Sequence, residues 1–181
     1  MKKILLLFIA QLFILSAIIG QNRNLQQDKP QEGYKFTPVY DLKATPVKNQ
    51  SATGTCWCFA TTSFIESELL RMGKGEYDLS EMYIVRMNYI NRLKDNYLRR
   101  GKGNLGPGSL AHDWMRVFSE NGIVPDEVYT GLNYGSPTHN HSELQSFINA
   151  VAAVPVERRK ESPQYVSIVD AVLDTYLGKV P

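Results

Sequence analysis

Apolar side chains recur every three or four residues in several stretches of the chain, which is the spacing of one buried face of an α-helix. Polar residues, glycines and prolines separate these stretches and give each predicted helix its start and stop. The predicted helices run from Cys56 to Gly73, from Ser80 towards Arg99 and Arg100, from Leu110 to Asn121, over 144–151, and from Ser162 to Gly178. The pattern is therefore mainly helical.

The connections between these helices are polar or rich in residues that break regular structure. Residues 51–55 form a small polar loop around Gly54, and residues 101–108 hold four glycines and a proline. Pro38 and Pro46 each push the preceding residue out of the helical region. We expect loops at the first two segments and edge or connecting pieces at the two prolines.

Residues 1–20 have the composition of an export signal. Lys2 and Lys3 give a basic start, and an apolar run follows over 4–19. A cleaved signal peptide over 1–20 predicts export to the periplasm or secretion. An uncleaved segment would instead anchor the chain, and only in that case do we expect a membrane partner.

Composition places the rest of the chain among ordinary globular domains. The 181 residues are 43% hydrophobic and 21% charged, with 2 cysteines, which excludes a disulfide-rich scaffold. Residues 21–35 can bury almost nothing and predict a flexible leader, so the folded part is expected over 36–181. The net charge of +2 comes from Lys2 and Lys3, which leaves 18 basic and 18 acidic side chains after cleavage. Such a neutral chain is not expected to bind nucleic acid.

The residues that indicate chemistry surround Cys56. A cysteine in the first turn of a helix faces unpaired backbone N–H groups and the positive end of the helix dipole, which stabilise a nucleophilic thiolate. Gln50 lies six residues upstream across the Gly54 loop, so its side-chain amide can return to the sulfur. With the Cys56 N–H it would donate two hydrogen bonds to a developing oxyanion, each worth roughly 3 kcal/mol of the barrier.

Residues 46–60 read PVKNQSATGTCWCFA, with a Gln and then Gly-x-Cys-Trp-x-Phe at fixed spacing. This segment resembles the active-site strand and helix of papain-like cysteine peptidases. The resemblance implies that Cys56 is the nucleophile, Gln50 the oxyanion donor and Trp57 a packing residue at the substrate site. It also implies an α+β fold in which a mostly helical N-terminal half packs on a β-barrel half. The implied function is cysteine-type peptide hydrolysis through a thioester, with no metal and no organic cofactor.

Further stretches extend the resemblance. Residues 79–81 are similar to the family's Leu-Ser-Glu helix start, and residues 106–109 to the glycine-rich loop of its substrate cleft. By this resemblance Gly108 and Ser109 would meet the backbone of a peptide substrate, since a residue without a side chain permits close approach. Thr53 stands where secreted relatives usually carry a disulfide-bonded cysteine. This departure favours the bleomycin hydrolase and aminopeptidase C branch, and with it trimming from the peptide N-terminus.

The family's site also needs a His and an Asn, with the His typically about 130–150 residues after the Cys. Only 125 residues follow Cys56, and His112, His139 and His141 come too early for that role. We therefore expect a C-terminally truncated peptidase that lacks the β-barrel half and is inactive by itself. The alternative is a catalytically inactive remnant that binds peptides, and a homo-oligomer is compatible with either.

Other candidate residues have plainer interpretations. Cys58 points about 200° away from Cys56 on a helix, so we expect a buried core thiol and no disulfide between the two. His139 and His141 share one loop and fall short of the three or four ligands of a metal site, so we expect a solvated loop and helix cap. His112 opens a predicted helix near the cleft and is expected to pack.

Overall fold

The structure, a computed structural model, describes residues 33–181. The predicted signal peptide over 1–20 and residues 21–32 of the predicted leader lie outside the described residues. Residues 33–41 belong to a unit distinct from residues 42–181, contain neither helix nor strand, and expose their side chains. The described helices all belong to the unit over 42–181.

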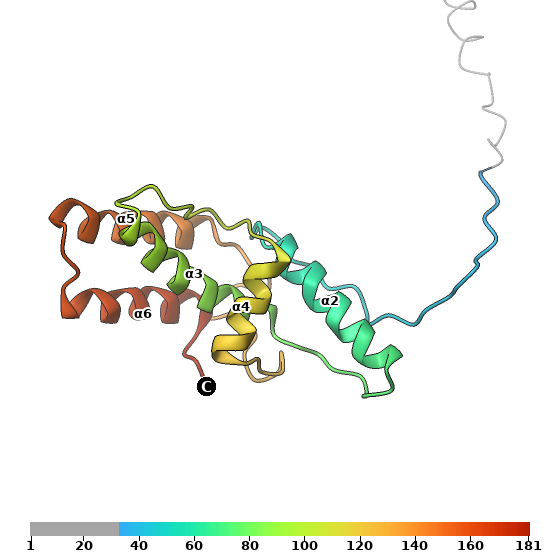
Figure 1. Ribbon diagram of the computed structural model, residues 1–181. Coiled ribbons are helices and arrows are strands. Elements are labelled where there is room, and N and C mark those ends of the chain that lie inside the picture. Colours follow the sequence, from blue (N-terminus) through green and yellow to red (C-terminus); the bar gives the residue numbers. More distant parts are fainter. Residues whose placement is uncertain (1–32) are drawn as a thin grey trace, which may run out of the picture. The chain divides into compact units, whose positions relative to one another are not determined.

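The helices are α2 (Cys56–Arg71), α3 (Glu81–Leu98), α4 (Ala111–Asn121), α5 (Ser142–Arg158) and α6 (Pro163–Leu177), and Figure 1 shows their order. Each coincides with a predicted helix, so the helical prediction is confirmed, although α5 continues well beyond 144–151. Within residues 33–181, β-type backbone pairing is limited to two isolated bridges, Ala52 with Asn140 and Leu79 with Pro125. No helix in this range is both long enough and apolar enough to cross a membrane.

Local sequence sets several helix ends. The Ser80 hydroxyl accepts a hydrogen bond from the Tyr83 N–H at 3.0 Å and so caps α3. Gly122 and Gly178 follow α4 and α6 with φ angles of 75° and 84°, a region that glycine enters without steric cost. Pro163 begins α6, where its missing N–H removes no helical hydrogen bond.

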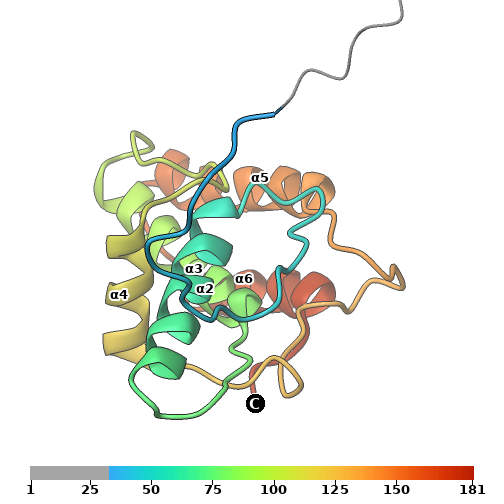
Figure 2. The same cartoon turned by 90° about the vertical axis from the view of Figure 1, so that its right-hand side faces the viewer.

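Helix α3 forms the centre of the unit, because it packs against each of the other described helices (Figure 2). Its side chains Met82 and Ile84 are 1% and 0% exposed. The other helices contribute buried apolar side chains to the same core, among them Trp57, Cys58, Trp114, Val117, Leu144, Ile148, Leu173 and Leu177. Trp57 and Cys58 belong to the first turn of α2. Because burial of apolar surface stabilises a fold by about 25 cal/mol per Å², the packing of these two side chains in the core holds the start of α2 in place.

Candidate active site

Cys56 is the first residue of α2, and its free thiol is exposed at the helix N-terminus. The preceding residue, Thr55, is buried, and its carbonyl accepts hydrogen bonds from the N–H groups of Cys58 and Phe59. Within residues 33–181 the Cys56 N–H has no partner, so it can donate to a group beside the thiol. The predicted position of this thiol at the start of a helix is confirmed.

Gln50 and Cys56 stand at the two ends of a short loop that hydroxyl groups shape. The Thr53 hydroxyl donates to the Gln50 carbonyl at 2.9 Å and is hydrogen-bonded to the Thr55 hydroxyl. Gly54 has a φ of 66°, which glycine adopts readily. The Gln50 side chain is half-buried, and its amide has no partner in the described part of the chain. That amide therefore remains free to donate hydrogen bonds.

Trp57 joins the start of α2 to the glycine-rich loop. Its indole N–H donates to the Pro107 carbonyl at 3.0 Å, and the side chain is buried. Gly54 packs on the same proline, since a Cβ at Gly54 would lie 2.8 Å from Pro107 Cγ. The fold thus brings the predicted substrate loop against α2, with Trp57 packed between them rather than facing solvent.

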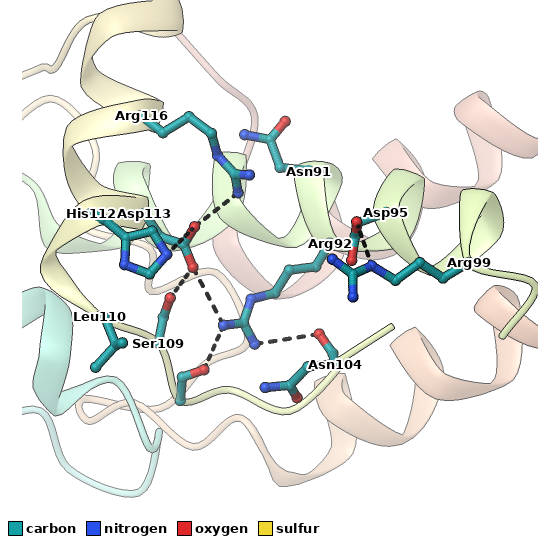
Figure 3. Close-up of a pocket in the computed structure, with 11 residues that line it drawn as sticks. Asn91, Arg92, Asp95, Arg99, Asn104, Ser109, Leu110, His112, Asp113 and Arg116 are labelled. Carbon is teal, nitrogen blue, oxygen red and sulfur yellow. Dashed lines mark hydrogen bonds and ion pairs between the residues drawn. The ribbon is translucent and has the colours of Figure 1, made fainter. Parts of the chain in front are cut away.

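Arg92 on α3 holds the carbonyl groups of the glycine-rich loop (Figure 3). Its guanidinium donates to the carbonyls of Gly106 and Gly108, the latter at 2.6 Å, and lies 3.6 Å from the Asp113 carboxylate. The Ser109 hydroxyl also donates to Asp113. Gly108 is exposed, and its N–H has no partner among the described residues, so it remains free to donate a hydrogen bond. Sequence analysis missed Arg92, because no local pattern links an arginine on a helix to the carbonyls of a later loop.

A partly buried ion cluster fixes the segment that leads into the Gln50 loop. The Lys48 ammonium lies 2.6 Å from a carboxylate oxygen of Asp78, 3.0 Å from Glu81 and 3.4 Å from Glu66. Burial raises the pKa of Glu81 to about 7, because the attraction of Lys48 offsets it only in part. Burial alone would lower the pKa of Lys48, but the hydrogen bond with Asp78 and the charges of Glu81 and Glu66 raise it. The negative charges of two buried carboxylates, Glu66 and Glu81, are thus balanced by the ammonium group of Lys48.

His139 and His141 lie beside the same loop. The Ala52 N–H donates to the His139 carbonyl and the His141 N–H to the Ala52 carbonyl, both at 3.1 Å. His141 is 2% exposed, and neither of its ring nitrogens has a partner. Burial, with the neighbouring His139 adding to it, lowers the pKa of His141 to about 4. The predicted solvated loop is wrong for His141, because pairing with Ala52 draws it into the protein, although it does precede α5 as the cap residue.

Cys58 and His112 have contrasting environments. Cys58 is fully buried, its thiol donates to the Glu81 carbonyl at 3.3 Å, and burial raises the pKa of that thiol, so the predicted core role is confirmed. The His112 side chain is 73% exposed with its ring 3.5 Å from Asp113, so the packing expectation is wrong.

None of the three histidines, all of which are described, is hydrogen-bonded to the Cys56 thiol. Residues 33–181 contain no group of three or more side chains able to hold a metal ion.

The sequence of the chain matches a known protein family. The papain family of cysteine proteases matches residues 38–172, which is most of the chain. The chain therefore belongs to the papain family of cysteine proteases. The predicted papain-like family is confirmed, and over the described residues this papain-family domain is mostly helical.

Individual relatives carry cysteine protease names. "Probable cysteine protease RD19B" of Arabidopsis thaliana is 28% identical over 146 residues, which cover 75% of this chain and 40% of the relative. "Cysteine proteinase A" of Leishmania mexicana is 28% identical over 147 residues, covering 75% and 39%. "Cysteine proteinase 1, mitochondrial" of Saccharomyces cerevisiae is 24% identical over 140 residues, covering 66% and 28%. The chain spans about two fifths of the length of the first two relatives.

Proposed function

We propose that Cys56 is the nucleophile of a cysteine peptidase. Its thiolate attacks the carbonyl carbon of the scissile peptide bond, and the Gln50 amide and the Cys56 N–H donate hydrogen bonds to the oxygen that becomes negative. The C–N bond then breaks, the amine leaves with a proton from a general acid, and a thioester remains on Cys56. Water hydrolyses the thioester, which releases the acid product and restores the thiolate. These steps call on no metal ion and no organic cofactor.

The observation that carries this proposal is the exposed Cys56 thiol at the first turn of α2, at the point where the glycine-rich loop is bound. Trp57 attaches that loop to the helix through the Pro107 carbonyl, and Arg92 binds the loop carbonyls from α3. The exposed N–H of Gly108 is then available to a peptide. A thiol at a helix start beside a rigid, backbone-binding loop suits attack on a peptide bond.

We propose that the general base, a histidine oriented by an asparagine, comes from a part of the enzyme other than residues 33–181. The surroundings of the described histidines support this, because His141 is buried and His112 is exposed beside Asp113. The covered share of the relatives, about two fifths of their length, supports it too. The chain by itself is then expected to alkylate slowly at neutral pH and to turn over no peptide.

We also propose that the enzyme trims peptides from their N-terminus and acts outside the cytoplasm. Thr53, in place of a disulfide-bonded cysteine, supports the bleomycin hydrolase and aminopeptidase C branch; in the structure it is a buried, hydrogen-bonded residue. The export signal predicted over 1–20 supports a periplasmic or secreted enzyme. Peptides are the expected partners.

Peptide binding without hydrolysis is the second candidate function. It is favoured by one observation, the lack of a histidine bonded to the Cys56 thiol within residues 33–181. A protein of this kind would keep the loop around Gly108 and bind the peptide backbone there. It would leave the peptide bond intact.

Peptide hydrolysis by the native protein separates these candidates. We expect Cys56→Ala to abolish product formation and Gln50→Ala to lower kcat by about 10²-fold, as the loss of an oxyanion donor does. Cys58→Ala, which removes a buried thiol, is expected to retain activity. Trimming of unblocked but not of N-acetylated peptides would support aminopeptidase action. Equal hydrolysis by the wild type and Cys56→Ala would overturn the assignment of the nucleophile, and binding without hydrolysis would favour the second candidate.

A further inference from the structure

A cavity of about 620 Å³ opens beside Gly108, between α3, the glycine-rich loop and the start of α4 (Figure 3). The charged and titratable side chains in its wall are those of Arg92, Arg99, Arg116, His112, Asp95 and Asp113. Positive groups outnumber negative ones even when the histidine is neutral. The cavity also borders Ser109, so it adjoins the loop on which the proposed peptide would lie.

The Asp113 carboxylate within this cavity is already occupied. It accepts a hydrogen bond from the Ser109 hydroxyl and lies 3.0 Å from Arg116, 3.5 Å from the His112 ring and 3.6 Å from Arg92. A carboxylate has about four acceptor positions, so little capacity remains for a basic ligand. The guanidinium of Arg92 already has partners as well, since it also donates to the loop carbonyls of Gly106 and Gly108.

Two other guanidinium groups keep most of their donors free. Arg116 contacts Asp113 through one nitrogen, and Arg99 contacts Asp95 through Nε at 3.0 Å. Their side chains are 45% and 64% exposed, and Figure 3 shows them reaching into the cavity from α4 and from the end of α3. A guanidinium carries five N–H donors in a rigid fork that matches a carboxylate, so each can still bind one.

We propose that this cavity binds an acidic side chain, aspartate or glutamate, of a peptide that lies on Gly108. The inference rests on the proposed function, because that function places the peptide on the glycine-rich loop. Gly108 leaves room for it, since no atom beyond Gly108 and its two chain neighbours lies within 4 Å of the position its Cβ would take. Successive side chains of an extended peptide point in opposite directions, so one residue beside Gly108 can enter the cavity while its neighbours point away. Arg116 and Arg99 then give the cavity its preference for an aspartate or glutamate side chain.

Peptidyl chloromethyl ketones test this preference on the native protein. A glutamate is moved through the three positions that precede the reactive carbon, and each reagent is compared with its glutamine equivalent. At one position the glutamate reagent is expected to alkylate Cys56 about fivefold faster, as an exposed charge pair allows. High salt is expected to reduce this advantage. Arg116→Gln and Arg99→Gln are each expected to lower it, whereas Arg71→Gln, an exposed position on α2, retains it.

The outcomes separate the cavity from the peptidase chemistry. Equal rates for glutamate and glutamine at every position, with peptide reagents still faster than chloroacetamide, would overturn the acidic cavity and leave the proposed function standing. Peptide reagents no faster than chloroacetamide would count against the proposed function. In that case fluorescein-labelled glutamate and glutamine tripeptides are compared for binding to Cys56→Ala, and equal binding would overturn the cavity. Both arginines are exposed, and matched urea midpoints show that their variants fold.

Discussion

The indole N–H of Trp57 donates a hydrogen bond to the carbonyl of Pro107, 50 residues further along the chain, at 3.0 Å. Trp57 immediately follows Cys56, and Pro107 immediately precedes Gly108. This hydrogen bond therefore helps to set the position of the glycine-rich loop relative to the thiol, beside the hydrogen bonds that Arg92 donates to the same loop. The donor is buried with the ring, so breaking this bond changes both the stability of the fold and the contact between α2 and the loop.

Trp57→Phe removes the donor and keeps an aromatic ring. We expect the free energy of unfolding to fall by about 1–3 kcal/mol, from the lost hydrogen bond and the smaller ring. Alkylation of Cys56 by a peptidyl chloromethyl ketone is expected to slow, because the loop loses its hydrogen bond to α2 and is then held mainly by Arg92. Urea unfolding and alkylation rates measure the two effects. Trp114→Phe is the control, since the Trp114 indole donates to Thr62 inside the core at 2.9 Å. Slowing of equal size in both variants would contradict a specific role for Trp57.

Gly54→Ala and Gly73→Ala separate backbone conformation from steric contact. The two glycines have φ angles of 66° and 67°, so both variants carry the same left-handed penalty of about 1–2 kcal/mol. A Cβ at Gly73 meets nothing within 4 Å, whereas one at Gly54 lies 2.8 Å from Pro107 Cγ. We expect Gly54→Ala to lose at least about 1 kcal/mol more in urea unfolding, and to slow peptide-directed alkylation of Cys56. Equal losses would mean that the Pro107 loop moves aside freely.

The helices and the place of Cys56 at a helix start could be predicted from the sequence because their signals are local. A 3.6-residue apolar period marks each helix, and Ser80 and Gly122 have the cap chemistry that local sequence displays. Cys56 at a helix start followed from a short motif and its spacing. The hydrogen bonds from Arg92 to the loop carbonyls could not be predicted, because they depend on how α3 packs against a segment that the sequence shows only as glycine-rich.

Lys48→Met leaves Glu66 and Glu81 buried without a cation. We expect the free energy of unfolding to fall by about 3–5 kcal/mol at neutral pH, as removal of one partner from a buried ion pair does. The loss is expected to shrink towards pH 5, because burial raises the pKa of Glu81 to about 7 and its neutral form then predominates. Urea unfolding at both pH values measures this. Lys74→Met, at an exposed position, is the control, and Glu66→Gln added to Lys48→Met is expected to restore part of the loss. A loss that does not vary with pH would contradict the assignment.

His141 is expected to make the fold sensitive to acid. Burial lowers the pKa of His141 to about 4 in the folded chain, while the unfolded chain takes up a proton near pH 6.5. Between these values the unfolded state binds more protons, so the free energy of unfolding decreases as the pH falls from about 6.5 to 4, by up to about 3 kcal/mol. Urea unfolding across this range is expected to show a shallower slope for His141→Leu than for the wild type. His112→Leu, at an exposed position, keeps the slope. Equal slopes for the wild type and His141→Leu would exclude this mechanism.

The burial of His141 also shows why part of the site could not be predicted. Two histidines separated by one residue in a polar stretch have the pattern of a solvated loop. Their pairing with Ala52, 87 residues before His139, is a long-range contact that no local pattern encodes. The same holds for Lys48 and Glu81, which lie far apart in the sequence and form an ion pair at 3.0 Å in the fold.

The most direct test measures which thiol of the native protein a peptidyl chloromethyl ketone labels, and how fast. Mass spectrometry after proteolysis locates the adduct, and chloroacetamide serves as the reagent without a peptide. If Cys56 is a nucleophile presented to a bound peptide, a single adduct forms on Cys56, and the peptide reagent reacts faster than chloroacetamide. Labelling of Cys58 at a similar rate, or equal rates for the two reagents at Cys56, would contradict it.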